Sequence, residues 1–110
     1  MAPRTDLLQG TLDLLILRTL TLEPHHGWGI ARRIHTLTRG TFDVRPGSMF
    51  PALKRLEEKG WIAASWATSD NGRRAKFYAL TASGRKQLRA ELEQWRRVSD
   101  GIGWALEGTR

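Results

Sequence analysis

The sequence predicts a mainly α-helical fold that contains a small β-hairpin and ends in a long helix. Apolar residues recur at helical spacing in three successive segments of the N-terminal half. Two strand-like runs then flank an Asn-Gly turn, the residue pair that a tight hairpin favours. From residue 82 onward, residues suited to a helix interface are spaced alternately four and three apart, as along the seam of a coiled coil.

The first helix is expected from Asp6 to Leu20, and it has two apolar stripes. Because a surface helix of a monomer needs only one such stripe, we expect one to pack inward and the other to contact a partner chain. The first stripe contains Leu8, Leu12 and Leu15. The second stripe, on another face, contains Leu7, Leu14 and Leu17.

Two further helices follow, separated by short connections. After a break at residues 23–27, we expect a helix from about Trp28 to Thr38 whose buried face contains Ile30, Ile34 and Leu37. The third helix is expected to begin at Ser48, because its hydroxyl can accept hydrogen bonds from free backbone N–H groups. Pro51 would then lie in the first turn, and Gly60 would end the helix. The buried stripe consists of Met49, Leu53 and Leu56.

The C-terminal half is expected to form the hairpin and one long helix. The strands span Trp61 to Thr68 and Lys76 to Leu80, with a basic turn between them. Thr81 can cap a helix from about Ala82 to Ala105, which would be roughly 35 Å long. Gly101 and Gly103 are expected to fray or bend its end. The seam positions are Leu88, Leu92, Trp95, Ser99, Ile102 and Leu106.

Composition narrows the class of protein. The 110 residues fit one domain, and 18 Lys and Arg against 11 Asp and Glu give a net charge of +7. A small basic domain is a candidate for nucleic-acid binding, although a basic surface also serves solubility. Cysteine is absent, which excludes disulfides and suits a reducing cytoplasm. The longest apolar stretch is too short to span a membrane, and the N-terminus is not typical of a signal peptide.

The residues do not form a pattern typical of an enzyme or a metal site. We find no cysteine nucleophile, no Gly-rich phosphate loop and only three histidines, so we expect neither catalysis nor a cofactor. His25 and His26 are adjacent and would point apart, so we expect no bound metal.

The predicted order matches a winged helix-turn-helix, in which the hairpin is the wing. In such modules the third helix enters the major groove of DNA, and the wing touches phosphate or the minor groove. Taken singly, the basic residues are also explained by a solvated helix face and a charged hairpin tip that protects a sheet edge. In this order together they favour DNA binding. The expected DNA-binding residues are Arg45, Ser48, Phe50, Lys54, Arg55, Arg73, Arg74 and Lys76.

Three stretches are similar to those of a known family: His26-Gly27-Trp28-Gly29-Ile30, Gly47-Ser48-Met49-Phe50-Pro51-Ala52-Leu53, and Asn71-Gly72-Arg73-Arg74 with Lys76-Phe77-Tyr78. With them, the chain resembles the PadR-like transcriptional regulators along nearly its whole length. The resemblance implies a repressor that is a homodimer, with the C-terminal helix packed against the partner's first helix. Residues 1–80 would form the DNA-binding domain and residues 81–110 the dimerisation helix, in one compact unit. A two-fold dimer would bind an inverted repeat in double-stranded DNA.

The chain departs from the family at the third helix. Phe50 stands where the family usually has tyrosine, so any hydrogen bond from that hydroxyl to DNA is absent here. Trp95 has two possible roles: a knob in the dimer seam, or a platform for a small aromatic effector with Leu14 and Ser99 as neighbours. Relief of operator binding by such a ligand is suggested by family members that bind aromatic or cationic compounds. The expected interface residues are Leu14, Leu17, Leu88, Leu92, Trp95 and Ile102.

The main alternative to a sequence-specific regulator is a winged-helix module that contacts protein or binds nucleic acid without operator specificity. RNA recognition would favour exposed aromatic residues on a sheet, and a hairpin offers little sheet area.

Overall fold

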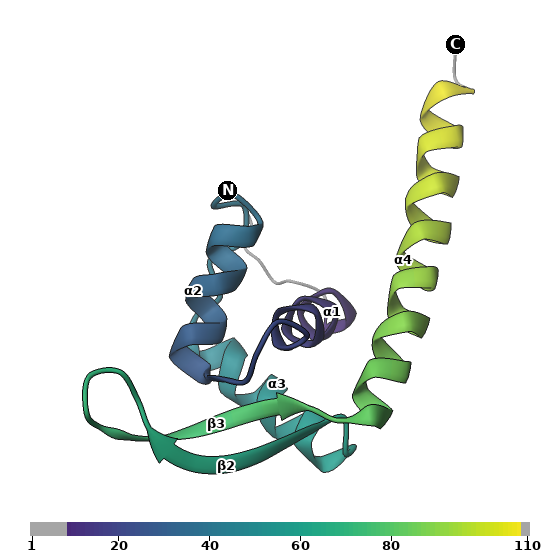
Figure 1. Cartoon of the computed structure of the whole chain (residues 1–110). Helices are drawn as coiled ribbons and strands as arrows, with labels where there is room; N and C mark the ends of the chain where they lie inside the picture. The colour runs from purple at the N-terminus through teal and green to yellow at the C-terminus, as the bar shows by residue number, and fades with distance from the viewer. Residues whose placement is uncertain (1–8, 109–110) are drawn as a thin grey trace.

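The computed structural model describes residues 9–108, which form four helices and a three-stranded antiparallel sheet (Figure 1). The helices are α1 (Gln9–Leu20), α2 (Gly27–Leu37), α3 (Pro46–Glu58) and α4 (Ala82–Glu107). The strands are β1 (His25–His26), β2 (Ile62–Thr68) and β3 (Arg74–Leu80), in the order β1-β3-β2. The expected succession of three helices, hairpin and long helix is confirmed. Residues 6–8 of the expected first helix lie outside the described residues.

The core lies where α1, α2 and α3 meet. Its fully buried side chains include Ile16, Ile30, Ile34 and Leu53, and the expected stripe of α3 is buried as predicted. The expectation for Leu37 is wrong: its side chain is half exposed, because Leu37 is the last residue of α2 and lines an open cleft.

Two residues expected in the dimer interface belong instead to this core. Leu17 is fully buried, and Leu88 is 7% exposed where the first turns of α4 pack against α1. Both side chains are packed within the protomer, so neither is free on the surface to meet a partner. The prediction that Leu17 lies on the outward stripe of α1, facing a partner chain, is therefore wrong.

The third helix begins two residues earlier than expected, and Ser48 does not cap it. Arg45 is the N-cap, and its backbone carbonyl accepts from the N–H groups of Ser48 at 3.0 Å and Met49 at 2.9 Å. Pro46, with its preset φ, occupies the first helical position, where its missing N–H costs little. Pro51 consequently lies inside the helix rather than in its first turn.

A short strand replaces the expected break before α2. His25 pairs with Tyr78 and His26 with Phe77, so β1 ties the start of α2 to the wing. The Nδ1 atom of His26 accepts from the backbone N–H of Gly29 at 2.9 Å, and this side chain thereby caps α2. Histidine is an uncommon cap and two residues show no alternation, so the sequence contains little signal for either feature.

The last helix is longer than expected. Thr81 caps it as predicted, by accepting from the backbone N–H of Gly84 at 2.9 Å. The expected fraying at Gly101 and Gly103 is wrong: α4 continues to Glu107, and its C-terminal part stands clear of the other helices (Figure 1). Two glycines cost about 1 kcal/mol each relative to alanine, which the surrounding backbone hydrogen bonds outweigh. Among residues 9–108, no helix is long and apolar enough to cross a membrane.

The close approach of α4 to the base of β2 predicts a contrast between two of its glycines. A Cβ atom at Gly84 would collide with the backbone oxygen of Trp61, whereas one at Gly101 meets nothing within 4 Å. We expect Gly84→Ala to lower the free energy of unfolding by about 1–3 kcal/mol. We expect Gly101→Ala to raise it by roughly 0.5–1 kcal/mol, because alanine is the better helix former. Urea unfolding of both variants measures this, and equal stabilities would contradict the close contact.

Candidate nucleic-acid interface

The exposed face of α3 is set by the burial of its other face. Burial of Met49, Leu53 and Leu56 leaves Ser48, Phe50 and Lys54 on the outer side of the helix. Phe50 is 51% exposed, and its ring lies against the start of α2, where a Cβ atom at Gly27 would come within 2.7 Å of it. Glycine at position 27 therefore leaves room for the Phe50 ring beside the exposed face of α3.

The wing is built on a regular hairpin. Thr68 pairs with Arg74 and Trp66 with Lys76, so these four side chains lie on one face of the two strands. At the tip, Gly72 has a φ of +83°, which confirms the glycine-dependent turn predicted for Asn71-Gly72. The side-chain oxygen of Asn71 accepts from the Ser69 hydroxyl at 2.6 Å and from the Arg73 backbone N–H at 3.3 Å. These bonds order the tip that carries the arginines.

Trp66 is a residue of this interface that the sequence reasoning did not select. Its side chain is 59% exposed, with the Arg74 guanidinium 5.4 Å from the centre of its ring. A cation held over an exposed ring keeps its charge toward solvent and orders a long side chain. The sequence feature that could have identified Trp66 is its position directly across the hairpin from a basic strand.

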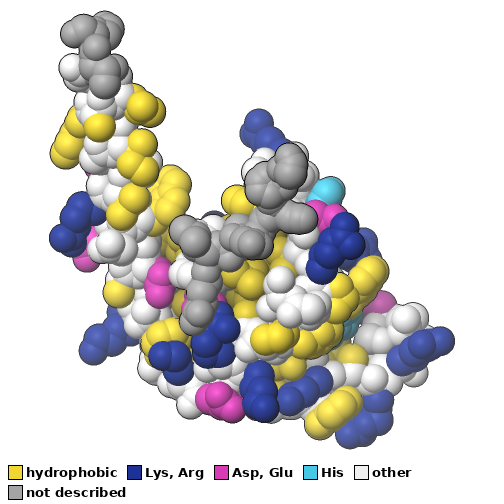
Figure 2. Space-filling view, turned by 180° about the vertical axis from the view of Figure 1, so that it is seen from behind, with side chains coloured by type: hydrophobic (Ala, Val, Ile, Leu, Met, Phe, Trp, Pro, Cys, Tyr) yellow, Lys and Arg dark blue, Asp and Glu magenta, His cyan; other side chains and the backbone are white. Residues whose placement is uncertain are grey.

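A cleft separates the wing from the starts of α2 and α3. Its volume is about 350 Å³, and its lining includes Trp28, Phe50, Arg73, Arg74 and Lys76. A second, wider cleft of about 600 Å³ lies between the wing tip and α2, and Trp28 lines it too. Lys and Arg side chains gather at the wing end of the molecule (Figure 2, lower right). The concave, basic surface between α3 and the wing has the chemistry needed to follow a phosphate backbone.

Arg55 does not belong to this surface. Its Nη2 atom donates to the Oδ1 atom of Asp13 on α1 at 2.5 Å, and the Asp13 side chain is almost completely buried. Since this guanidinium is turned toward α1 and paired with Asp13, Arg55 is not among the unpaired cations that we expect to contact DNA. Helical spacing had placed it off the buried stripe, but a long side chain can reach a buried carboxylate from there.

The other cations expected to bind DNA differ in whether they form ion pairs within the protein. Lys76 lies 3.5 Å from Glu57 in an exposed ion pair, which is worth little and leaves the ammonium able to exchange partners. Arg45, Lys54, Arg73 and Arg74 make no ion pair among the described residues. Ser48 is exposed in the first turn of α3 rather than at its cap, so it lies on the solvent-facing side of the helix with Phe50 and Lys54.

The histidines beside the cleft have structural partners. The Nδ1 atom of His25 accepts from the His26 backbone N–H at 3.2 Å, and its ring occupies the space over Gly29. Burial, followed by the nearby charges of His26 and Arg33, lowers the pKa of His25 below its ordinary value. At neutral pH this imidazole is therefore uncharged and adds nothing to the basic surface.

These features define a winged helix-turn-helix DNA-binding protein, with α2 and α3 as the helix-turn-helix and β2–β3 as the wing. Residues 16–90 match the model of the "Transcriptional regulator PadR-like family". The chain belongs to this family and is a DNA-binding regulator of transcription.

Individual relatives agree with this assignment. The chain is 31% identical over 93 residues to the "Transcriptional regulator YqjI" of Escherichia coli, covering 84% of this chain and 43% of that protein, so it spans less than half of that relative. A PadR family transcription regulator from Clostridium difficile R20291 is 31% identical with a TM-score of 0.74, over 86% of this chain and 97% of that one. The smu.1704 protein of Streptococcus mutans is 25% identical with a TM-score of 0.84, over 96% and 95% of the two chains.

The wing arginines should contribute to binding of any duplex. We expect replacement of Arg73 and Arg74 by alanine to weaken binding to operator and random DNA alike. The slope of log K against log salt should become shallower by about 0.9 for each phosphate that the variant no longer neutralises. Titration of a labelled duplex at several salt concentrations measures this.

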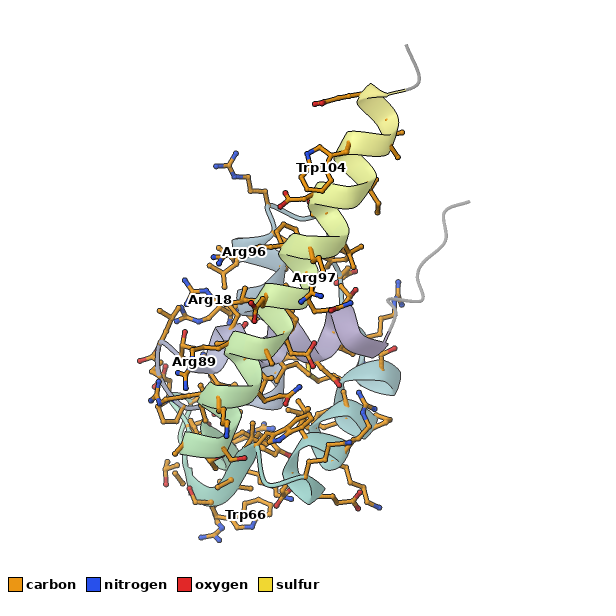
Figure 3. The ribbon with its side chains drawn as sticks, turned by 90° about the vertical axis from the view of Figure 1, so that its right-hand side faces the viewer. Arg18, Trp66, Arg89, Arg96, Arg97 and Trp104 are labelled. Carbon is orange, nitrogen blue, oxygen red and sulfur yellow. The ribbon has the colours of Figure 1, made fainter. Side chains whose placement is uncertain are left out.

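Arg97→Ala is the matched control for this prediction. Arg97 is exposed on α4, far from the wing that carries Trp66 (Figure 3). If the wing variants behaved like Arg97→Ala, the wing would have no part in DNA binding.

Proposed function

We propose that the protein is a homodimeric repressor that binds an inverted-repeat operator in double-stranded DNA. The observation that carries this proposal is the surface formed by α3 and the wing, where Phe50, Arg73 and Arg74 line one cleft and Lys54 is exposed one turn further along α3. One such surface covers about half an operator, so sequence specificity calls for two copies related by a two-fold axis. Repression follows from the family resemblance and from the capacity of a bound dimer to occupy promoter DNA.

The projecting part of α4 supports the dimer. Trp95 is 55% exposed and Ile102 is 56% exposed, and hydrophobic side chains follow this helix beyond the rest of the molecule (Figure 2). Leu14 and Leu92 are half buried where α1 faces α4, so they adjoin this apolar strip. An apolar strip that one small protomer leaves open is typical of a surface that a partner covers. The seam we propose consists of Leu14, Leu92, Trp95, Ile102 and Leu106.

We also propose that a small, flat aromatic compound binds beside this seam and weakens operator binding. Trp95 presents an exposed indole and Ser99 an exposed hydroxyl one turn away, with Leu14 on the facing side of α1. A ligand held between two such helices would favour one spacing of the two reading helices over another. Operator affinity measured with and without the aromatic probe 8-anilinonaphthalene-1-sulfonate tests this, with Trp95→Ala as the variant expected to lose the response.

The operator proposal predicts a specific footprint. On DNA from upstream of the protein's own gene, we expect protection of an inverted repeat whose half-sites are about 10 base pairs apart or a multiple of this. Nuclease footprinting, with a shuffled fragment of equal length as the control, measures it. Equal affinity for both fragments would instead identify a nonspecific nucleic-acid-binding module.

The dimer proposal predicts that a charged substitution on the seam face of α4 disrupts the dimer, whereas one on the opposite face does not. Ile102 lies in the seam, whereas Trp104 is rotated roughly 200° from it around the helix. We expect Ile102→Asp to produce monomers and to lower operator affinity at least tenfold, and Trp104→Asp to do neither. Sedimentation equilibrium measures the mass, and a monomeric wild-type protein would contradict the seam.

A further inference from the structure

A buried ion pair joins the reading helix to α1. The carboxylate of Asp13 is 9% exposed and accepts from the Arg55 guanidinium at 2.5 Å, across 42 residues of sequence. The Nε atom of Arg55 is buried and without a hydrogen-bond partner in the described structure, so the guanidinium is held through its Nη2 atom. The Asp13 side chain is almost completely buried and engages the Arg55 guanidinium, and the proposed function does not use the pair.

The surroundings of Asp13 oppose its charge, and Arg55 favours it. Burial raises the pKa of the Asp13 carboxyl above its ordinary value, whereas the hydrogen bond and the positive charge of Arg55 oppose this rise. The buried carboxylate therefore depends on its contact with Arg55.

We propose that Asp13 is a positioning residue for α3, the helix expected to enter the DNA groove. The Asp13–Arg55 pair fixes α3 against α1 by a directional polar contact, which apolar packing alone does not supply. This inference rests on the proposed function, because it concerns how operator DNA is read.

Three effects distinguish this role from ordinary stabilisation. A buried ion pair that only stabilises the fold would, when broken, lower the folded fraction and weaken all DNA binding equally. Removal of a positioning interaction instead misaligns the base-reading side chains, while phosphate contacts made by the wing persist. The affinity ratio of operator to random duplex should therefore fall, the affinity for random duplex should stay, and substitutions of the two partners should not be additive.

The experiment measures this ratio for the full-length dimer on the footprinted duplex and on a random duplex of equal length. We expect Asp13→Asn and Arg55→Gln each to lower the ratio about tenfold, and the double variant to be no worse than either. The control is Glu23→Gln, the same kind of substitution in the exposed Glu23–Arg33 pair of 3.2 Å, which should leave the ratio unchanged. Arg55 is the more exposed partner, so Arg55→Gln can still be measured if Asp13→Asn folds poorly.

The outcomes separate the two proposals. A wild-type protein that binds both duplexes equally overturns the operator proposal and this inference with it. A discriminating wild type whose variants lose affinity equally on both duplexes, or keep the wild-type ratio, overturns only the positioning role of Asp13.

Discussion

The architecture depends on the burial of one face of α3. Met49, Leu53 and Leu56 are at most 1% exposed, and each buried side chain of this size contributes about 1.5–3 kcal/mol. The helix cannot turn about its axis without exposing them. Its opposite face, with Phe50 and Lys54, is consequently presented to solvent in one orientation, which is what a helix that reads a DNA groove requires.

The position of the wing depends on the same core, because β1, a strand of two residues, connects the two. An isolated two-stranded hairpin is marginally stable in water, and here β1 adds a third strand to β3. His26 belongs both to this strand and to the cap of α2, and its ring lies 5.3 Å from that of Phe77. His26 thus links the helix-turn-helix to the wing, in addition to the backbone pairing of β1 with β3 and the contacts of α3 with β2.

The long α4 has a different role, because most of it is not covered by its own protomer. Its first turns are fastened by the Thr81 cap and by the close approach of Gly84 to the Trp61 backbone. The C-terminal part of the helix stands clear of the other helices (Figure 1), and its apolar residues Trp95, Val98 and Ile102 are about half exposed. In the proposed dimer a partner would cover this helix and thereby stabilise the fold, which connects the dimer to folding as well as to operator spacing.

Local patterns were enough to predict the succession of elements. Apolar periodicity located the helices, Asn71-Gly72 located the hairpin turn, and Thr81 located the start of α4. Each of these signals acts over a few residues, so no knowledge of the rest of the chain is needed to read it. The concentration of basic residues around the third helix and the turn was likewise visible in the order of the residues alone.

Features that depend on distant partners were not predictable in this way. Periodicity showed that Leu17 is apolar but not which of two faces of α1 the core would take. Arg55 was counted among the DNA contacts because its buried partner, Asp13, lies 42 residues away. The strand at His25–His26 exists only because β3 comes alongside it. The sequence by itself determined the four helices, the hairpin and the basic chemistry of the third helix and the turn, since these come from neighbouring residues. Only the tertiary structure decided which charges stay free for DNA, because that depends on long-range packing.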